Sequence, residues 1–374
     1  MPTSKAPATT APVEDARAGL RAELADLTAY VPSMPEGIEV KLDANEAPPV
    51  EPELREIVAR AMAAVPLEVY PDPRAERLRA AISARTGAPP GDLLVGTGSD
   101  EVISLIVNAF AQPRRKNTQA VVLAPTPSFV MYRVTARAHG VKPVELPLDA
   151  AWDLDAKTMS RAIEMMSPNV VFIASPNNPT GNVVSRDRLE AVLEQAKGAF
   201  VVVDEAYVDY APGSVRELRA RHANLGVLRT LSKVGLAALR VGWLEADAGL
   251  VGEIDKGRQP FNVSATSQLG AAAALEEGYD ALSRGVARVR EARDALAREL
   301  DALEGFEVTP SDANFLWVRT AAPAGDVYEH LVREGVLVRS FHARGGRLAH
   351  QLRVTIGRPE DNARLLDALS RAPR

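Results

Sequence analysis

The sequence predicts an α/β fold in which a mostly parallel sheet is sandwiched by helices and is joined to a smaller α+β unit. Apolar runs at 169–176, 199–207, 224–231 and 240–246 have nearly continuous hydrophobic character, which is typical of strands buried on both faces. Segments with helical periodicity, such as 185–197, alternate with them. This alternation of strand and helix indicates a parallel sheet.

A change of pattern divides the second half of the chain. From about residue 260 the strands give way to helix, and 279–303 is predicted as one long helix. Short apolar strands around a helix at 325–334 then predict a compact α+β unit. We expect three parts: a disordered tail and N-terminal arm at 1–45, a large domain at 46–264 and a small C-terminal domain at 265–374.

The first residues contain few large apolar groups. Residues 1–16 are rich in Pro, Ala and Thr, a composition that is typical of a disordered tail. Leu20, Leu24 and Leu27 then fall at helical spacing. We therefore expect a short helix in the arm that docks on the rest of the molecule.

Composition excludes several classes of function. The 374 residues have a formal net charge of -5, so the sequence offers no basic footprint for nucleic acid. There is no cysteine, which excludes disulfides, thiolate metal sites and a thiol nucleophile. The five histidines lack a metal-binding spacing, and no apolar run reaches transmembrane length. We expect a cytoplasmic protein with no metal, no membrane and no nucleic-acid partner.

The segment RTLSKVGLAALRVGW (229–243) carries polar groups between two predicted strands. It places Thr230, Ser232, Lys233 and Arg240 within a short, otherwise apolar stretch. Burial disfavours the charged form of a lysine and favours the neutral, nucleophilic amine. A lysine with a buried stem and its charge in water remains the alternative from these residues alone.

Neighbouring strand ends supply partners for this lysine. The run 169–181 ends in an Asn-rich turn that contains Asn178, and the strand at 199–207 delivers Asp204 and Tyr207. In an open parallel sheet the carboxyl ends of the strands line the ligand crevice. An amide, an acid with a phenol, and an amine are therefore expected in one place.

The stretch 92–111 is predicted as a short strand, a Gly-Thr-Gly turn and an amphipathic helix, and its turn suits an anion. The backbone N–H groups near Ser99 and Asp100 lie in the first turn of that predicted helix, where they have no intrahelical acceptor. Together with the positive end of the helix dipole, they can bind a phosphate. An ordinary N-cap role for Ser99 is the alternative.

Together these segments resemble the fold-type I, pyridoxal-phosphate-dependent aminotransferases, and most closely the histidinol-phosphate aminotransferases. Six motifs in family order, spread over most of the chain, carry the resemblance. It implies a fold-type I transferase, the cofactor pyridoxal 5'-phosphate, and a homodimer with shared active sites. The motifs are YPDP (70–73), VGTGSDE (95–101), SPNNPTG (175–181), VVVDEAY (201–207), TLSK (230–233) and LRVTIG (352–357).

The resemblance also implies roles around the cofactor ring. Lys233 would be the catalytic residue, which attaches the cofactor and then acts as general base and acid. Asp204 would pair with the pyridine nitrogen, and Asn178 and Tyr207 would hydrogen-bond the phenolic oxygen. Phe129 would stack on the ring, with a plain core position as its alternative.

The cofactor phosphate has its own implied set of residues. By resemblance they are Thr230, Ser232, Arg240, the amides at Ser99 and Asp100, and Tyr70 from the other subunit. One departure concerns Arg240, which follows Lys233 by seven residues where the family commonly has eight. The spacing leaves Arg240 as the best candidate but leaves its register open.

For the substrate, the resemblance points to Tyr30, Arg339 and Arg353. A bidentate arginine would grip the carboxylate or phosphate at the far end of the substrate. Packing is the alternative for the tyrosines at 30 and 70, and a surface ion pair is the alternative for Arg339. Arg353 lies among apolar neighbours, which favours a role in the site.

The function implied is an aminotransferase that interconverts L-histidinol phosphate and 2-oxoglutarate with imidazole acetol phosphate and L-glutamate, in histidine biosynthesis. An aromatic amino acid aminotransferase or a threonine-phosphate decarboxylase on the same fold is the alternative, because small contact differences decide specificity. A non-catalytic relative that regulates transcription would need a helix-turn-helix extension and a basic surface, and the sequence contains neither.

Overall fold

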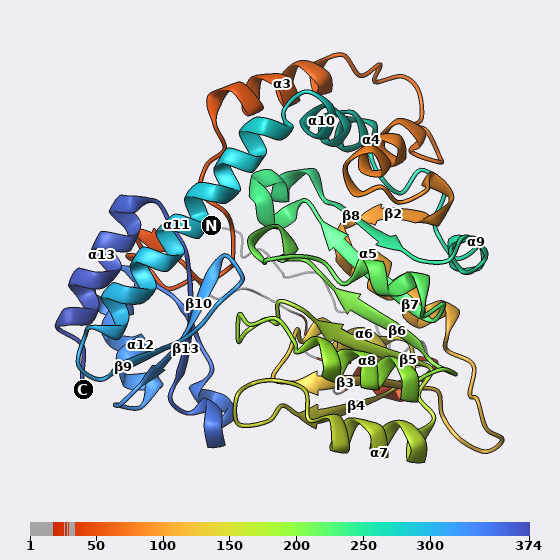
Figure 1. Ribbon diagram of the computed structural model, residues 1–374. Helices are drawn as coiled ribbons and strands as arrows, with labels where there is room; N and C mark the ends of the chain where they lie inside the picture. Colours follow the sequence, from red (N-terminus) through yellow and green to blue (C-terminus); the bar gives the residue numbers. More distant parts are fainter. Residues whose placement is uncertain (1–17, 26, 28, 30–33) are drawn as a thin grey trace, which may run out of the picture.

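A seven-stranded sheet forms the centre of the larger part of the molecule (Figure 1). The structure is a computed structural model that describes residues 18–25, 27, 29 and 34–374. Only β8 runs antiparallel to its neighbours β2 and β7, so the predicted α/β fold with a mostly parallel sheet is confirmed. In spatial order the strands are β2 (Leu93–Thr97), β8 (Val241–Glu245), β7 (Leu225–Thr230), β6 (Phe200–Asp204), β5 (Val170–Ala174), β3 (Val121–Thr126) and β4 (Lys142–Pro147).

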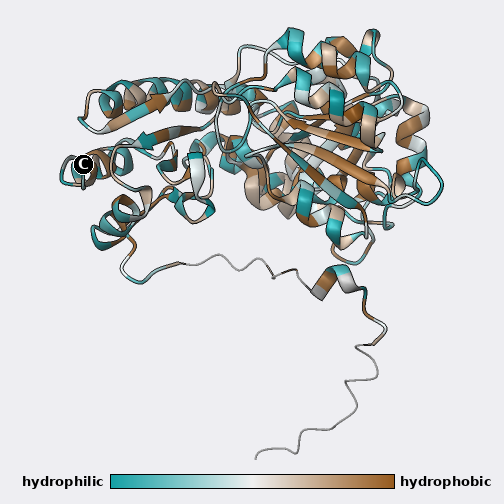
Figure 2. Ribbon diagram, turned by 90° about the horizontal axis from the view of Figure 1, so that it is seen from below, coloured by the Kyte–Doolittle hydropathy of each residue, from teal (hydrophilic) through white to brown (hydrophobic). Residues whose placement is uncertain are grey.

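Alternate residues of these strands enter two separate cores. In β5, Phe172 packs with the helices on one face of the sheet, whereas Val171 and Ile173 pack with those on the other. Both faces are therefore apolar, which explains the continuous hydrophobic runs, and the strands are brown in Figure 2. One face is covered by α5 (Gly98–Ala109), α6 (Met131–Ala138) and α9 (Ala248–Asp255), and the other by α7 (Ala156–Met166) and α8 (Arg186–Gln195).

The C-terminal residues form a further core beside the sheet (Figure 1). The predicted long helix is α11 (Tyr279–Asp301), whose side chains contact this C-terminal core and also a cluster at the β2 edge of the large sheet. The antiparallel sheet here has the order β12 (Arg339–Ser340), β13 (Gln351–Thr355), β10 (Phe315–Thr320) and β9 (Phe306–Thr309), and α12 (Ala324–Arg333) and α13 (Pro359–Ser370) pack with it.

Segments from both sides of the expected domain boundaries pack together. β1 (Val40–Lys41) pairs in parallel with β11 (Val336–Leu337) of the C-terminal part. Helix α10 (Ala265–Glu276) packs on α3 (Pro52–Ala63) and α4 (Glu76–Thr86), beside the large sheet. The boundaries near residues 45 and 264 stay predictions.

Short turns complete the chain, and the arm helix is present in part. α2 (Ala22–Ala25) contacts α6, and the Arg21 guanidinium donates to the carbonyl of Ala138. Among the described residues, no helix is both long and apolar enough to cross a membrane. The turns are Pro90–Asp92, Val208–Tyr210, Arg216–Ala220, Ala237–Leu239, His342–Arg344 and Gly346–Leu348 in 3-10 form, and Ser232–Leu236 in π form.

A close backbone contact fixes the start of α5 against β8. A Cβ atom added to Gly242 would lie 2.4 Å from the Ser99 nitrogen and 2.6 Å from the Gly98 carbonyl carbon. Both neighbours are backbone atoms, so they cannot move aside without shifting the first turn of α5. Only glycine at 242 allows this turn to approach the sheet.

We therefore expect Gly242→Ala to destabilise the protein by about 1–3 kcal/mol, the usual cost of overpacking a well-packed site. Urea unfolding followed by circular dichroism measures the change. Gly252→Ala is the matched control, because a Cβ there meets no atom within 4 Å. Equal stability of the two variants would show that the turn has room to move.

Candidate active site

The carboxyl ends of three adjacent strands bring the predicted residues together. Asp204 ends β6, Thr230 ends β7, and Asn178 follows the end of β5. The strand register sets Asp204 between Ala174 of β5 and Leu228 of β7. The sheet therefore delivers the acid, the amide and the segment of Lys233 to one edge, as the sequence predicts.

Asp204 is a buried carboxylate held by two donors. Its side chain is only 5 % exposed. The Tyr132 hydroxyl donates to one oxygen at 2.7 Å, and the Ala206 amide donates to the other at 3.0 Å. Burial raises the pKa of Asp204 to about 6, although the Tyr132 hydrogen bond opposes the shift. A cationic ligand group beside Asp204 would favour its charged form.

Tyr132 was not identified from the sequence. Its ring is fully buried, stacks on Phe172 with the centroids 4.7 Å apart, and meets the edge of Phe129 at 5.6 Å. Burial raises the pKa of Tyr132 well above its ordinary value, so the hydroxyl remains a donor to Asp204 at neutral pH. Phe129 itself is partly buried against the same core as α5 and α6.

Lys233 lies in the π-type turn that follows β7. Its side chain is partly buried, and its Nζ lies 5.8 Å from the ring centroid of Tyr207. Among the residues that the structure describes, no carboxylate lies within ion-pair distance of this amine. The Tyr210 hydroxyl donates to the Lys233 carbonyl at 2.6 Å and anchors the backbone. The amine therefore points into the site without a competing acid.

Tyr207 and Asn178 are each oriented by a residue from far along the chain. The Asn45 amide donates to the Tyr207 hydroxyl oxygen at 2.9 Å, which leaves the phenol proton for another acceptor. Arg353 donates to the side-chain oxygen of Asn178 at 2.5 Å, so the NH₂ group of Asn178 is the part that can donate to a ligand. Asn45 is buried, and it too was not identified from the sequence.

Hydroxyl groups and a guanidinium surround the start of α5. The Thr230 hydroxyl accepts from the Ser232 amide at 3.1 Å, and Arg240 donates to the Ser232 hydroxyl at 3.3 Å. Arg240 also lies 3.5 Å from the carboxylate of Asp100. A Cβ on Gly98 would lie 2.5 Å from the Arg240 guanidinium, so this side chain covers the first turn of α5, which contains Ser99.

Residues 38–369 match the family model described as aminotransferase class I and II. The chain belongs to this family. It is 40% identical to the histidinol-phosphate aminotransferase of Chromobacterium violaceum over 94% of this chain and 97% of that one. It is 39% identical to the histidinol-phosphate aminotransferase of Aquifex aeolicus over 88% and 91% of the two chains.

Solved aminotransferase-like structures share the fold. The histidinol-phosphate aminotransferase of Sinorhizobium meliloti, solved with pyridoxal-5'-phosphate, has a TM-score of 0.82 at 23% identity and covers 94% of this chain and 96% of its own. The L-threonine-O-3-phosphate decarboxylase of Porphyromonas gingivalis has a TM-score of 0.73 at 20% identity, with 88% and 98% covered. The fold therefore accommodates both transamination and decarboxylation.

Aminotransferases of this family use pyridoxal 5'-phosphate, and the residues present fit it. The Lys233 amine has no acid partner among the described residues, the desolvated Asp204 calls for a cation, and Arg240 with α5 forms an anion cradle. No group of three or more His, Cys, Asp or Glu side chains in the described part of the chain could hold a metal ion.

Three other predicted residues lie apart from this cluster or outside the described chain. Tyr70 is 80% exposed and stacks on Phe261, with the ring centroids 4.7 Å apart. Arg339 is exposed, opposite the buried Arg353 in the β12 and β13 register. Tyr30 lies outside the described residues.

The shifted pKa of Asp204 predicts a pH dependence for the cofactor-free protein. The folded pKa of about 6 lies above the ordinary value, so the folded state holds the proton more tightly than the unfolded state. Stability should therefore fall as pH rises from about 4 to about 6, by on the order of 3 kcal/mol from this group alone. Urea midpoints across this range, compared with those of Asp204→Asn, measure the contribution.

Asp204→Asn removes the titrating group and should lose this fall, because an amide stays neutral across the range. The exposed Asp187→Asn is the control and should keep the wild-type pH profile. An Asp204→Asn profile parallel to that of the wild type would mean that Asp204 titrates normally.

Proposed function

We propose that this aminotransferase transfers the amino group of L-histidinol phosphate to 2-oxoglutarate, which yields imidazole acetol phosphate and L-glutamate. The observation that carries the proposal is the identity of about 40% to histidinol-phosphate aminotransferases over nearly the whole of both chains. The strand register supports it, because Arg339 lies opposite Arg353, which contacts Asn178 of the site, and two arginines suit a dianionic group.

In this proposal Lys233 is the residue that moves protons. When bound, pyridoxal phosphate supplies an electron-withdrawing ring that stabilises negative charge at the substrate α-carbon. Lys233 Nζ removes the α-proton and later returns it, which requires an amine free of an acid partner. The ring centroid of Tyr207 lies 5.8 Å from this amine.

The remaining residues hold the cofactor in place. Asp204 would pair with the protonated ring nitrogen, and Tyr132 orients that carboxylate through its 2.7 Å hydrogen bond. The Asn178 amide and the Tyr207 hydroxyl would donate to the phenolic oxygen, and Phe129 would pack on the ring. The phosphate would be held by the amides, hydroxyls and guanidinium of Ser99, Asp100, Thr230, Ser232 and Arg240.

Arg353 and Arg339 are the proposed grip on the substrate, together with Tyr30. Directly opposed residues of an antiparallel pair project on the same face, so both guanidiniums can reach one anion. The same grip serves the phosphate of histidinol phosphate and the side-chain carboxylate of glutamate. A fork of two arginines explains how one site accepts both partners.

The decisive experiment follows the visible absorption of the purified, cofactor-loaded protein. L-Histidinol phosphate alone should bleach the yellow band, and 2-oxoglutarate should restore it. Lys233→Ala should lose this response and the formation of glutamate, while Lys256→Ala, an exposed lysine paired with Glu253, should behave as the wild type.

Other outcomes of the same experiment identify the alternatives. Bleaching by phenylalanine but not by histidinol phosphate would assign the chain to aromatic amino acids. Release of carbon dioxide from threonine phosphate, with no need for a keto acid, would assign it to decarboxylation. Either result overturns the proposed substrate and keeps the family.

We also propose a homodimer in which Tyr70 completes the partner's cofactor site. Tyr70 is 80% exposed, and its ring stacks on Phe261. Its hydroxyl is therefore available to a second copy of the chain. Variants defective in different residues of a shared site should then complement one another.

Lys233→Ala and Tyr70→Ala, each nearly inactive alone, should regain about a quarter of wild-type activity when mixed after mild dissociation, because half of the random dimers carry one intact site. The readout is glutamate formation by the mixture. A mixture of Lys233→Ala with Asp204→Ala is the control and should stay inactive, since both residues belong to the same chain's site. No gain with Tyr70→Ala would place Tyr70 outside the partner's site.

A further inference from the structure

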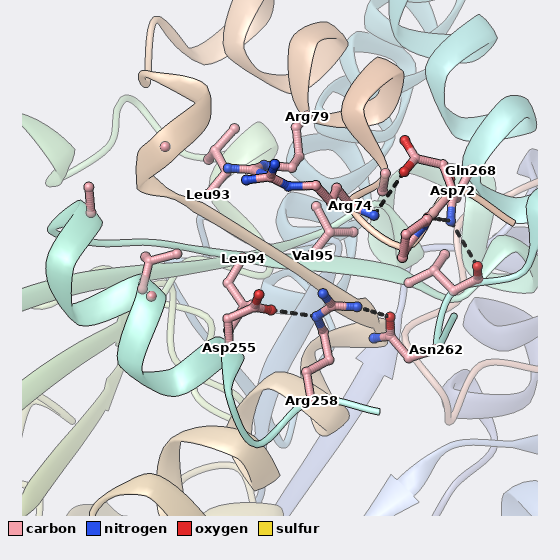
Figure 3. A pocket seen from close by; sticks show the side chains of 17 residues that line it. Asp72, Arg74, Arg79, Leu93, Leu94, Val95, Asp255, Arg258, Asn262 and Gln268 are labelled. Carbon is pink, nitrogen blue, oxygen red and sulfur yellow. Dashed lines mark hydrogen bonds and ion pairs between the residues drawn. The ribbon is translucent and has the colours of Figure 1, made fainter. Parts of the chain in front are cut away.

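A cavity of about 310 Å³ lies outside the active site, at the open edge of the large sheet (Figure 3). It is enclosed by the turn before α4, the edge strand β2, helix α9 and the loop at 258–263. Neither Lys233, Asp204 nor Arg240 lines it. Nothing in the proposed transamination uses this space.

Three arginines place positive charge in the lining of the cavity. Figure 3 shows Arg74 and Arg79 converging on one part of it, whereas Arg258 lies between Asp255 and Asn262. Burial, and then the repulsion from Arg74, lower the pKa of Arg79, while Asp255 and Glu76 act in the opposite direction. Two guanidinium groups of like charge are therefore held near one another at a partly enclosed surface.

The acidic groups of the cavity are already engaged. Asp255 accepts from Arg258 at 2.6 Å. Asp72 accepts from the backbone amides of Arg74 at 2.9 Å and Glu76 at 2.6 Å, where it caps the start of α4. Among the described residues, Arg74 and Arg79 form no ion pair with a carboxylate, and the Arg79 guanidinium donates to the neutral carbonyl of Pro90 at 3.0 Å.

The edge strand adds a neutral donor. Ala246 donates to Asp92, and Gly98 donates to Arg240, so the antiparallel ladder bonds β2 to β8 through its even-numbered residues. The N–H groups of Leu93 and Val95 therefore face the open edge. Leu93 donates to the Pro90 carbonyl, which leaves the Val95 amide directed toward the cavity that this residue lines.

We propose that this cavity is a second anion-binding site, which takes a small molecule bearing a phosphate or a pair of carboxylates. Arg74 and Arg79 supply charge-assisted hydrogen bonds to the anion, and the Val95 amide supplies a third donor. The volume admits a small metabolite rather than a bare ion alone.

The proposed second site connects to the start of α5 through the loop at 258–263. Arg258 donates to the Asn262 side chain at 2.9 Å, and Asn262 in turn donates to Glu101 of α5 at 2.8 Å. The Thr97 hydroxyl, just before α5, donates to the Asn262 carbonyl at 2.8 Å. A ligand in the cavity therefore contacts the loop that braces the proposed phosphate cradle.

The test is isothermal titration calorimetry of the full-length, cofactor-loaded protein, with inorganic phosphate and succinate as the two probes. In the Arg74→Gln/Arg79→Gln double variant, one of the binding events should weaken in affinity by at least about tenfold. Arg55→Gln changes an exposed arginine on α3 that forms no ion pair among the described residues. It is the control of matched charge type and should bind as the wild type. Binding of phosphate alone would assign a phosphate ligand, and binding of both probes would assign dianions in general.

If the double variant does not fold, Arg74→Gln alone serves as the test variant. The Arg74 side chain makes no hydrogen bond among the described residues, so its replacement should not disturb the fold. A crystal grown with tungstate, a phosphate analogue with strong anomalous scattering, should show the ion between Arg74 and Arg79. Unchanged anion affinity in both variants overturns the proposal. If the double variant instead shifts the monomer–dimer equilibrium in sedimentation, with anion affinity intact, the two arginines serve a contact between copies.

Discussion

The desolvated carboxylate of Asp204 is the constraint around which the site is arranged. It ends the central strand β6, flanked by β5 and β7, so any group that must meet the same ligand comes from a neighbouring strand end. Burial costs the charged form so much that the pKa of Asp204 rises to about 6 even with two donors in place. The site is therefore poised for a cation, and a protonated ring nitrogen meets that requirement.

Much of this arrangement could be predicted from the sequence, because local composition dictates it. The β5, β6 and β7 strands are apolar on both faces, and such strands belong to covered parallel sheets. Once the sheet is parallel, topology alone places Asn178, Asp204 and Lys233 at one edge. The glycine turn before α5 likewise marks a helix start at which backbone amides are unpaired.

Contacts between distant segments could not be predicted in the same way. Tyr132 and Asp204 are 72 residues apart, and Asn45 and Tyr207 are 162 apart. Tyr132 belongs to an amphipathic helix in which a buried aromatic residue is ordinary, so its pattern carries no sign of a hydroxyl aimed at an acid. Asn45 has a positive φ of 56°, a conformation that asparagine tolerates, but this angle is known only from the structure.

The backbone between Lys233 and Arg240 determines where the Arg240 guanidinium lies. The turn from Ser232 to Leu236 is wound in π form, and Gly235 has a φ of 94° that a side chain would resist. Arg240 itself has a φ of 51° and turns back over Gly98. The wider turn and these two left-handed residues redirect the chain so that the guanidinium reaches Ser232 at 3.3 Å. The anion cradle depends on where the Arg240 guanidinium lies in space. The number of residues between Lys233 and Arg240 does not by itself determine that position.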